Sequence, residues 1–316
     1  MCDLRKTAEA FSVSGTGRNM GKKDLAEKKL EDYNDVFADI FNTLLFGRKL
    51  LDPQRLREGA TASIYKAEQK GLCEQLRDTV KEYQDAERYV IAAYGIENQS
   101  GYDADMPIRV MGYDYGNYRR QLMEEKKPLH PVVTIVLNFS DRRWLKNKSL
   151  HELLQLSGEQ KEYVQDYRIR VFDIAFLGDE VIEQFQSDFK VVARFFKKKR
   201  LGNEPFKGQK MPVKHAEELL ELFSVFTGDR TYEEMVPYVR KEKAMGKEIE
   251  MCWVVQGYIN EGKMLGLEQG KQEEAALNAK MFFKNGASME LVAASIQSLT
   301  AEKLQEIYEE VQAEKA

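Results

Sequence analysis

The sequence predicts an α/β domain with a mixed β-sheet flanked by helices, followed by a helical C-terminal extension. Three apolar runs rich in β-branched and aromatic residues lie among stretches with helical periodicity, at residues 89–96, 131–139 and 168–176. The almost unbroken apolar character of residues 89–96 is typical of a strand covered on both faces. Beyond Arg200 no segment has a convincing strand pattern, and helical periodicity with many Glu, Lys and Ala residues dominates.

The elements are expected in the following order. Residues 1–28 mix glycine, serine and charged residues without periodicity, which predicts a flexible N-terminal arm. The α/β domain is expected over residues 29–200. Its first helix begins near Tyr33, because a set of apolar residues falls on one stripe: Val36, Phe37, Ile40, Phe41, Leu44 and Leu45. Residues 48–74 have no clear pattern, and residues 76–83 predict the strand that precedes the run at 89–96.

Two more helices are expected in this domain. One begins at Met106, with Pro107 in its first turn, a position that suits proline. The other spans residues 179–196. Residues 201–212 contain Gly, Pro and Lys and predict a linker, which leaves residues 213–316 as the helical C-terminal region.

Glycines recur in the C-terminal region at near-helical spacing: Gly257, Gly262, Gly266 and Gly270. Glycine inside a helix costs about 1 kcal/mol relative to alanine, so a repeat of this kind needs a reason. Close approach of another helix is one, and it predicts a homo-oligomer formed through the C-terminal helices. A frayed helix that packs on nothing is the alternative.

Composition limits the class of protein. The chain has 316 residues, a net charge of −4 and no run approaching 18 apolar residues, so no membrane span is expected. The N-terminus lacks the apolar core of a signal peptide. Three widely separated cysteines and only three histidines argue against a zinc site or a disulfide framework. A reducing, cytoplasmic location is therefore expected.

Two acidic residues stand out near the ends of neighbouring predicted strands. Asp78 is expected between Leu76 and Val80 on an inward face, and Glu97 follows the apolar run directly. A buried carboxylate is costly unless it is paired, hydrogen-bonded or bound to a cation. Two carboxylates close together repel each other unless a metal ion lies between them. The pattern therefore favours a divalent-metal site, although a surface ion pair at Asp78 and a solvated strand end at Glu97 are the simpler readings of each residue alone.

These residues also carry a family resemblance. An acid on one strand, followed by an acid-x-Lys pair at the end of the next, resembles the PD-(D/E)XK phosphodiesterase fold. The longer string ENQSGYDADMPIRVMGYDYGNYRRQL, residues 97–122, is similar to the recombination-promoting nuclease and putative transposase family of bacteria. The segments DYNDVFADIFNTLLFG and GYINEGKMLGLEQGK also resemble that family, and the resemblance spans roughly residues 30–310.

The resemblance implies a Mg²⁺- or Mn²⁺-dependent DNA endonuclease whose cuts promote recombination. It implies Asp78 and Glu97 as metal ligands, together with the backbone carbonyl of Asn98. Gln99 occupies the place of the catalytic lysine and offers no positive charge, so a catalytically inactive DNA-binding or assembly protein on the same fold is the alternative. The acid that the fold carries on its first helix would be Asp35 or Asp39.

Basic residues near these positions are candidates for contacts with DNA. Arg109 and Tyr113, on the helix after Gln99, are expected to hold phosphate, since a guanidinium group matches phosphate oxygens. A packing role for the tyrosine is equally compatible with the sequence. A second group follows the strand at 131–139 and contains Arg142, Arg143 and Lys146, with Trp144 as a residue able to stack on a base.

Overall fold

The computed structural model describes residues 29–60, 62–67, 71–76, 78–123, 128–204, 206 and 211–315. The predicted arm at residues 1–28 lies outside the described residues. The chain divides into two compact units, Met1–Ile249 and Glu250–Ala316. The linker expected at residues 201–212 therefore falls inside the first unit.

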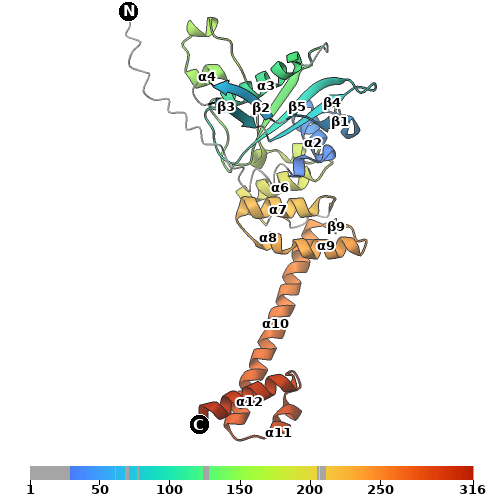
Figure 1. Cartoon of the computed structure of the whole chain (residues 1–316), viewed down its shortest axis with the longest axis vertical. Helices are drawn as coiled ribbons and strands as arrows, with labels where there is room; N and C mark the ends of the chain where they lie inside the picture. Colours follow the sequence, from blue (N-terminus) through green and yellow to red (C-terminus); the bar gives the residue numbers. More distant parts are fainter. Residues whose placement is uncertain are drawn as a thin grey trace, which may run out of the picture. The chain divides into compact units, whose positions relative to one another are not determined.

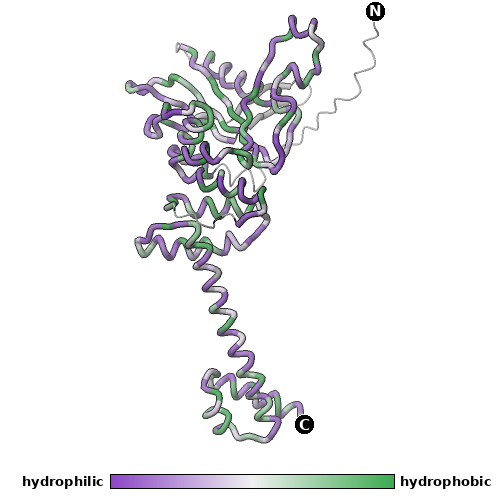
Figure 2. The backbone as a smooth tube through the Cα atoms, turned by 180° about the vertical axis from the view of Figure 1, so that it is seen from behind, coloured by the Kyte–Doolittle hydropathy of each residue, from purple (hydrophilic) through white to green (hydrophobic). Residues whose placement is uncertain are grey.

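A five-stranded mixed sheet forms the centre of the first unit, in the order β1-β4-β5-β6-β7 (Figure 1). β4 pairs antiparallel with β1 and β5, whereas β6 pairs parallel with β5 and β7. The strands are β1 (Leu56–Glu58), β4 (Thr79–Gln84), β5 (Val90–Gln99), β6 (Val132–Asn138) and β7 (Arg170–Asp173). Their central part is mostly hydrophobic (Figure 2), as expected of a sheet covered on both faces. The predicted mixed sheet flanked by helices is confirmed.

The region around Asp78 differs from its prediction. β2 (Ala62–Ala67) and β3 (Gly71–Leu76) form a separate antiparallel hairpin within the segment that had no clear pattern. The strand expected at 76–83 begins only at Thr79, because Leu76 pairs with Ala62 in the hairpin. Asp78 consequently lies in a bend at the start of β4.

Helices cover both faces of the sheet (Figure 1). On one face α3 (Met106–Met123) is joined to β6 by a hydrogen bond from Thr134 to Asp114. On the other face α2 (Asn34–Ile40) continues into the π-helix η1 (Phe41–Phe46), and the Phe41 ring packs edge-on against Tyr94 of β5. The expected stripe on this helix is buried at Val36, Phe37, Ile40 and Phe41.

The helix expected at residues 179–196 is two helices, α5 (Asp179–Ile182) and α6 (Phe189–Arg200). The break between them is stabilised by Asp39, which accepts hydrogen bonds from the backbone amides of Gln186 and Ser187. The break is thus a specific contact with α2, which periodicity along residues 179–196 does not reveal.

The remaining elements of the first unit follow around this core. Phe206 is buried against Phe195 and Phe223, which explains why the segment after α6 belongs to this unit. The further elements are η2 (Pro53–Arg55), α4 (Leu150–Leu154), η3 (Gln160–Glu162), η4 (Ile174–Phe176), β8 (Pro212–Val213), α7 (Ala216–Thr227), α8 (Thr231–Glu234), α9 (Val236–Ala244) and β9 (Ile249–Glu250).

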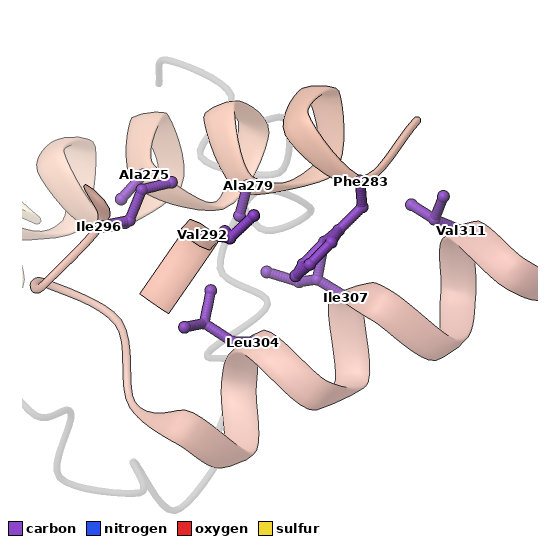
Figure 3. Packing of buried hydrophobic residues seen from close by; sticks show 8 residues of the cluster. All are labelled: Ala275, Ala279, Phe283, Val292, Ile296, Leu304, Ile307 and Val311. Atoms are coloured by element: carbon purple, nitrogen blue, oxygen red, sulfur yellow. The ribbon is translucent and has the colours of Figure 1, made fainter. Parts of the chain in front are cut away.

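The second unit consists of three helices, α10 (Met251–Lys284), α11 (Met289–Ser295) and α12 (Ala301–Lys315). They enclose a core of their own, which Figure 3 shows: Ala275, Ala279, Phe283, Val292, Ile296, Leu304, Ile307 and Val311. Residues 266–274 of α10 are all exposed. The predicted helical C-terminal extension is confirmed in its secondary structure, and its compact part begins within α10.

Among the described residues, no helix combines the length and the apolar character needed to cross a membrane.

Candidate active site

The candidate site lies where β5 ends. Alternation along the strand places Glu97 and Gln99 on the face covered by α3 and Asn98 on the face covered by α2. Both Glu97 and Asn98 are buried, with 1% and 5% of their surface exposed. One strand end therefore delivers polar side chains to both sides of the sheet.

On the α3 face, Glu97 pairs with a cation. Its Oε1 accepts a hydrogen bond from the Arg109 guanidinium group, whose other terminal nitrogen donates to Asp103 at 2.7 Å. Gln99 Nε2 lies 3.3 Å from the same Glu97 oxygen, so the predicted catalytic pair is in contact. Arg109 keeps 24% of its side chain exposed, which leaves part of the guanidinium group accessible from solvent.

Tyr113 supports this pair from within the protein. Its hydroxyl accepts a hydrogen bond from Arg109 at 3.1 Å and lies 3.5 Å from Glu97. Burial, together with the negative charge of Glu97, raises the pKa of Tyr113 to about 12. Burial by itself would lower the pKa of Arg109, but the charge of Glu97 together with the contacts to Tyr113 and Asp103 outweighs burial, so the pKa is raised. Tyr113 is only 3% exposed, so it positions Arg109 and does not reach a ligand at the surface.

Asp78 approaches from the bend before β4. Its Oδ2 accepts the backbone N–H of Asn98 at 2.7 Å, which ties the bend to the end of β5. The negative charge of Asp78 contributes to raising the pKa values of both Tyr113 and Glu31, which lie on opposite faces of the sheet. The carboxylate is therefore close to both groups of polar residues.

Glu31 is the site residue that the sequence analysis missed. It is 2% exposed, and its Oε2 accepts hydrogen bonds from Asn98 Nδ2 at 2.9 Å and from Thr79 Oγ1 at 3.2 Å. Burial, with a smaller contribution from the charge of Asp78, raises its pKa well above the usual range. Unlike Glu97, this carboxyl group is held by neutral donors and favours its protonated form.

The two acids expected from the first helix lie elsewhere. Asp35 pairs with Lys214 and His215, at 3.3 and 3.4 Å, and Asp39 binds the amides before α6. Both line a hollow of about 310 Å³ that does not include β5. The prediction was wrong in the choice of residue, because Glu31, which contacts Asn98, lies in a helical turn at residues 29–31 that a break at Asp32 and Tyr33 separates from α2. The sequence contains one sign that Glu31 is buried, which is the apolar residue Leu30 next to it.

Lys81 does not compensate for Gln99. Lys81, the nearest lysine on β4, is fully buried on the α2 face, where its Nζ donates to the backbone carbonyl of Asp32 at 2.7 Å and to Glu58. Arg109 is therefore the cation in contact with Glu97.

The donor atoms at this site suit a hard cation. Asn98 Oδ1 is buried without a hydrogen-bond partner, and the neighbouring ligand candidates are all carboxylate oxygens. Among the described residues, no three acidic, histidine or cysteine side chains are grouped closely enough to form a complete metal cage. Mg²⁺ commonly uses only one or two carboxylates and keeps several waters, so Asp78 and Glu97 fit its requirements in donor chemistry and number.

The second predicted basic group lies in the loop after β6. Arg142, Arg143 and Lys146 are exposed there, as a surface that contacts DNA requires. Trp144 is only 1% exposed and packs against Met106. The expected stacking of Trp144 on a base is therefore wrong, since its ring anchors the loop to α3.

Comparison with known proteins yields one match. A family model described as "Putative transposase, YhgA-like" matches residues 60–219, which is about half of the chain and includes every site residue above except Glu31, Asp35, Asp39 and Glu58. No curated protein and no solved structure matches the chain.

Proposed function

Because this chain belongs to the family of YhgA-like putative transposases, we propose that it is a metal-dependent DNA endonuclease with a PD-(D/E)XK-type core. Its cuts would promote DNA recombination. The observation that carries the proposal is the end of β5, where Asp78 accepts the backbone N–H of Asn98 next to the buried Glu97, while Glu31 binds the Asn98 side chain on the opposite face. Three separate segments of the chain place carboxyl groups around this strand end, and the cost of burying such groups favours a functional role.

Asp78 and Glu97 would hold Mg²⁺ or Mn²⁺, with the backbone carbonyl of Asn98 as a further oxygen. The ion would supply Lewis-acid stabilisation of the charge that develops on the phosphate group. Glu31 takes the place of the first-helix acid and fixes the Asn98 side chain through the 2.9 Å hydrogen bond.

The protein's own groups bind and orient the substrate. Arg109 is charged, partly exposed and next to Glu97, so its guanidinium group is placed to bind a phosphate oxygen of DNA. Asp103 and Tyr113 fix its orientation from two sides. Gln99 has an amide that can orient a water molecule, but it cannot donate a proton as a lysine would.

Plasmid cleavage tests this proposal. Purified wild type is compared with Asp78→Asn and Glu97→Gln in Mg²⁺, Mn²⁺ or EDTA, with Asp35→Asn as a matched control on the outer side of α2. We expect metal-dependent nicking that falls at least about 100-fold in both site variants and stays near wild type in the control. Cleavage that survives both site substitutions would overturn the proposal.

A second function is favoured by Gln99 and by the engagement of Glu97 with Arg109. A catalytically inactive DNA-binding or assembly protein needs no proton donor at position 99 and is stabilised by the Glu97–Arg109 pair. Isothermal titration with Mn²⁺ separates the two functions, since metal binding that requires Asp78 but accompanies no cleavage supports the inactive protein.

We also propose that α10 pairs with α10 of a second copy. Gly262, Gly266 and Gly270 have open space where a Cβ would be, while Met264 and Leu267 on the same stretch are exposed. In a monomer, Gly266→Ala stabilises the helix by about 1 kcal/mol. In a dimer packed through the glycines, the same change weakens association, which light scattering coupled to gel filtration measures.

A further inference from the structure

The carboxyl ends of β5, β6 and β7 form one row. Gln99 is the register partner of Asn138, and Asn138 is the partner of Asp173. Adjacent strands are about 4.8 Å apart, so Asp173 at the end of β7 lies roughly 10 Å from Gln99 at the end of β5. The segments that leave β6 and β7 therefore flank the candidate site at the edge of the sheet where α/β proteins usually bind ligands.

The loop after β6 is held in one conformation. Asp173 Oδ1 accepts hydrogen bonds from Asn138 Nδ2 at 2.7 Å and from the backbone N–H of Trp144 at 3.0 Å. Asn138 also donates to the carbonyl of Arg142 at 2.9 Å, and the Trp144 ring is buried. These contacts fix the backbone on both sides of Arg143.

The guanidinium groups of two arginines, one of which lies in this loop, stack on the same aromatic ring. Arg143 lies 4.8 Å and Arg200 4.3 Å from the centre of the Phe176 ring. Arg200 also donates from Nε to the carbonyl of Ala175 at 2.8 Å, which leaves its terminal nitrogens for other partners. Stacking on a ring orients a guanidinium group without neutralising it.

Neither arginine has a carboxylate partner in the part of the chain that the structure describes. Among the partly buried arginines of the first unit, Arg109 pairs with Glu97, Arg120 with Glu82 and Arg194 with Glu183, whereas Arg55 stacks on Tyr83. A pair of oriented positive charges without a counter-ion is a suitable partner for an anion from outside the protein.

We propose that Arg143 and Arg200, stacked on Phe176, bind the phosphate backbone of the DNA strand that enters the candidate active site. The inference rests on the proposed function and adds a named binding surface to it. The ring of Phe176 is occupied by the two guanidinium groups, so it is not available to stack on a base. Recognition at this surface is therefore through phosphate and independent of base sequence.

Metal-free binding tests the inference separately from cleavage. The affinity of full-length protein for two duplexes of unrelated sequence is measured by fluorescence anisotropy in EDTA, over a series of NaCl concentrations. The variant Arg143→Ala/Arg200→Ala is compared with Lys161→Ala/Arg168→Ala, which removes the same number of charges from the segment between α4 and β7. Circular dichroism of each variant checks that it is folded.

We expect the slope of log K against log salt to become shallower by about 2 in the Arg143/Arg200 variant, with the same loss for both duplexes. Phe176→Leu keeps both charges, so it lowers affinity only about threefold and leaves the slope unchanged. The control variant binds like wild type.

An unchanged slope and affinity in the Arg143/Arg200 variant, with DNA still bound, would overturn the inference and leave the nuclease proposal standing. A loss restricted to one duplex would also overturn it, because it indicates recognition of bases. Arginine-dependent binding by a protein that does not cleave would support this surface while refuting the proposed catalysis.

Discussion

Two buried glutamates lie on opposite sides of the same strand end, and the protein stabilises them in different ways. Glu97, on the α3 face, contacts the guanidinium group of Arg109. Glu31, on the α2 face, accepts hydrogen bonds from two neutral donors, the amide of Asn98 and the hydroxyl of Thr79. Burial and the charge of Asp78 raise the pKa of Glu31, whereas Glu97 has a cation beside it.

The difference indicates a division of roles. A carboxylate beside a cation stays ionised and is suited to bind a metal ion or to act on a substrate. A carboxyl group held by neutral donors favours protonation and is suited to fix neighbouring side chains. We therefore expect the α3 face to carry the chemistry and the α2 face to maintain the geometry of Asn98 and the Asp78 bend.

Removing the positive charge of Arg109 should have the largest effect on the free energy of unfolding. Arg109→Leu leaves Glu97 buried beside no positive charge, and we expect a loss of about 2–3 kcal/mol, less than for a fully buried pair because Arg109 is partly exposed. Urea unfolding measures it. Arg120→Leu, on the same helix, breaks a more exposed pair with Glu82 and should cost less than about 1 kcal/mol. Equal losses in the free energy of unfolding would show that the Arg109–Glu97 pair contributes no more to stability than the Arg120–Glu82 pair.

Replacing Glu31, the glutamate held by neutral donors, should change the free energy of unfolding in the opposite direction. Glu31→Gln mimics the protonated acid, so it should match wild type below about pH 4.3, the usual pKa of glutamate in an unfolded chain. Above that pH, the folded protein binds more protons than the unfolded one, and wild-type stability falls as pH rises towards the raised pKa of Glu31.

The variant lacks this dependence, so its advantage over wild type should grow by up to about 1.4 kcal/mol per pH unit within the window. Unfolding free energies measured in urea from pH 4 to 8 check the sign. A variant that is less stable than wild type at pH 7 would mean that Glu31 is ionised in the folded protein, and the contrast with Glu97 would be lost.

Removing the amide that binds Glu31 should have a smaller effect. Asn98→Leu keeps the side-chain size and leaves Glu31 with Thr79 as its remaining donor, which should cost about 1–2 kcal/mol. The decline in stability should also extend to a higher pH in the variant than in wild type, because the ionised form of Glu31 loses a hydrogen bond and its pKa rises further. Thermal unfolding at several pH values measures both changes, and a downward shift would contradict the role assigned to Asn98.

The smallest effect is expected at Thr79. Thr79→Val removes only the hydroxyl that donates to Glu31 at 3.2 Å, and a loss of about 0.5–1 kcal/mol is typical of one such hydrogen bond. Thr134→Val removes the 2.6 Å bond to Asp114 on the other face and serves as the comparison. We expect the Thr134 change to cost more, because its hydrogen bond to the Asp114 carboxylate is shorter than the bond from Thr79 to Glu31.

Much of the sheet was predictable because its central strands are long and apolar. β5, β6 and α3 have patterns that few other structures produce, and Glu97, Asn98 and Gln99 follow directly from the end of β5. The short strand β1 and the β2–β3 hairpin were not predicted, since strands of this length depend on their pairing partners more than on their own residues. Asp78 was assigned to the site for its charge, although its place in the chain is a bend and not a strand.

The parts of the site that depend on long-range contacts could not be predicted from the sequence. Glu31 is defined by bonds to residues 48 and 67 positions away, and no local pattern distinguishes it from Asp35 or Asp39. Similarly, the burial of Trp144 depends on Met106 and Ile169, which belong to separate elements. Periodicity reports the face of one helix or strand and carries no information about what another segment places against it.

The contact of Asp39 with the start of α6 also has a consequence for the order of events during protein synthesis. Asp39 and Ser187 are 148 residues apart in the chain. At a translation rate of about 5–20 residues per second, the helix that follows Glu31 waits roughly 7–30 seconds for this partner to be made. A nascent chain shorter than about 190 residues therefore lacks the contact between α2 and the segment that leads into α6.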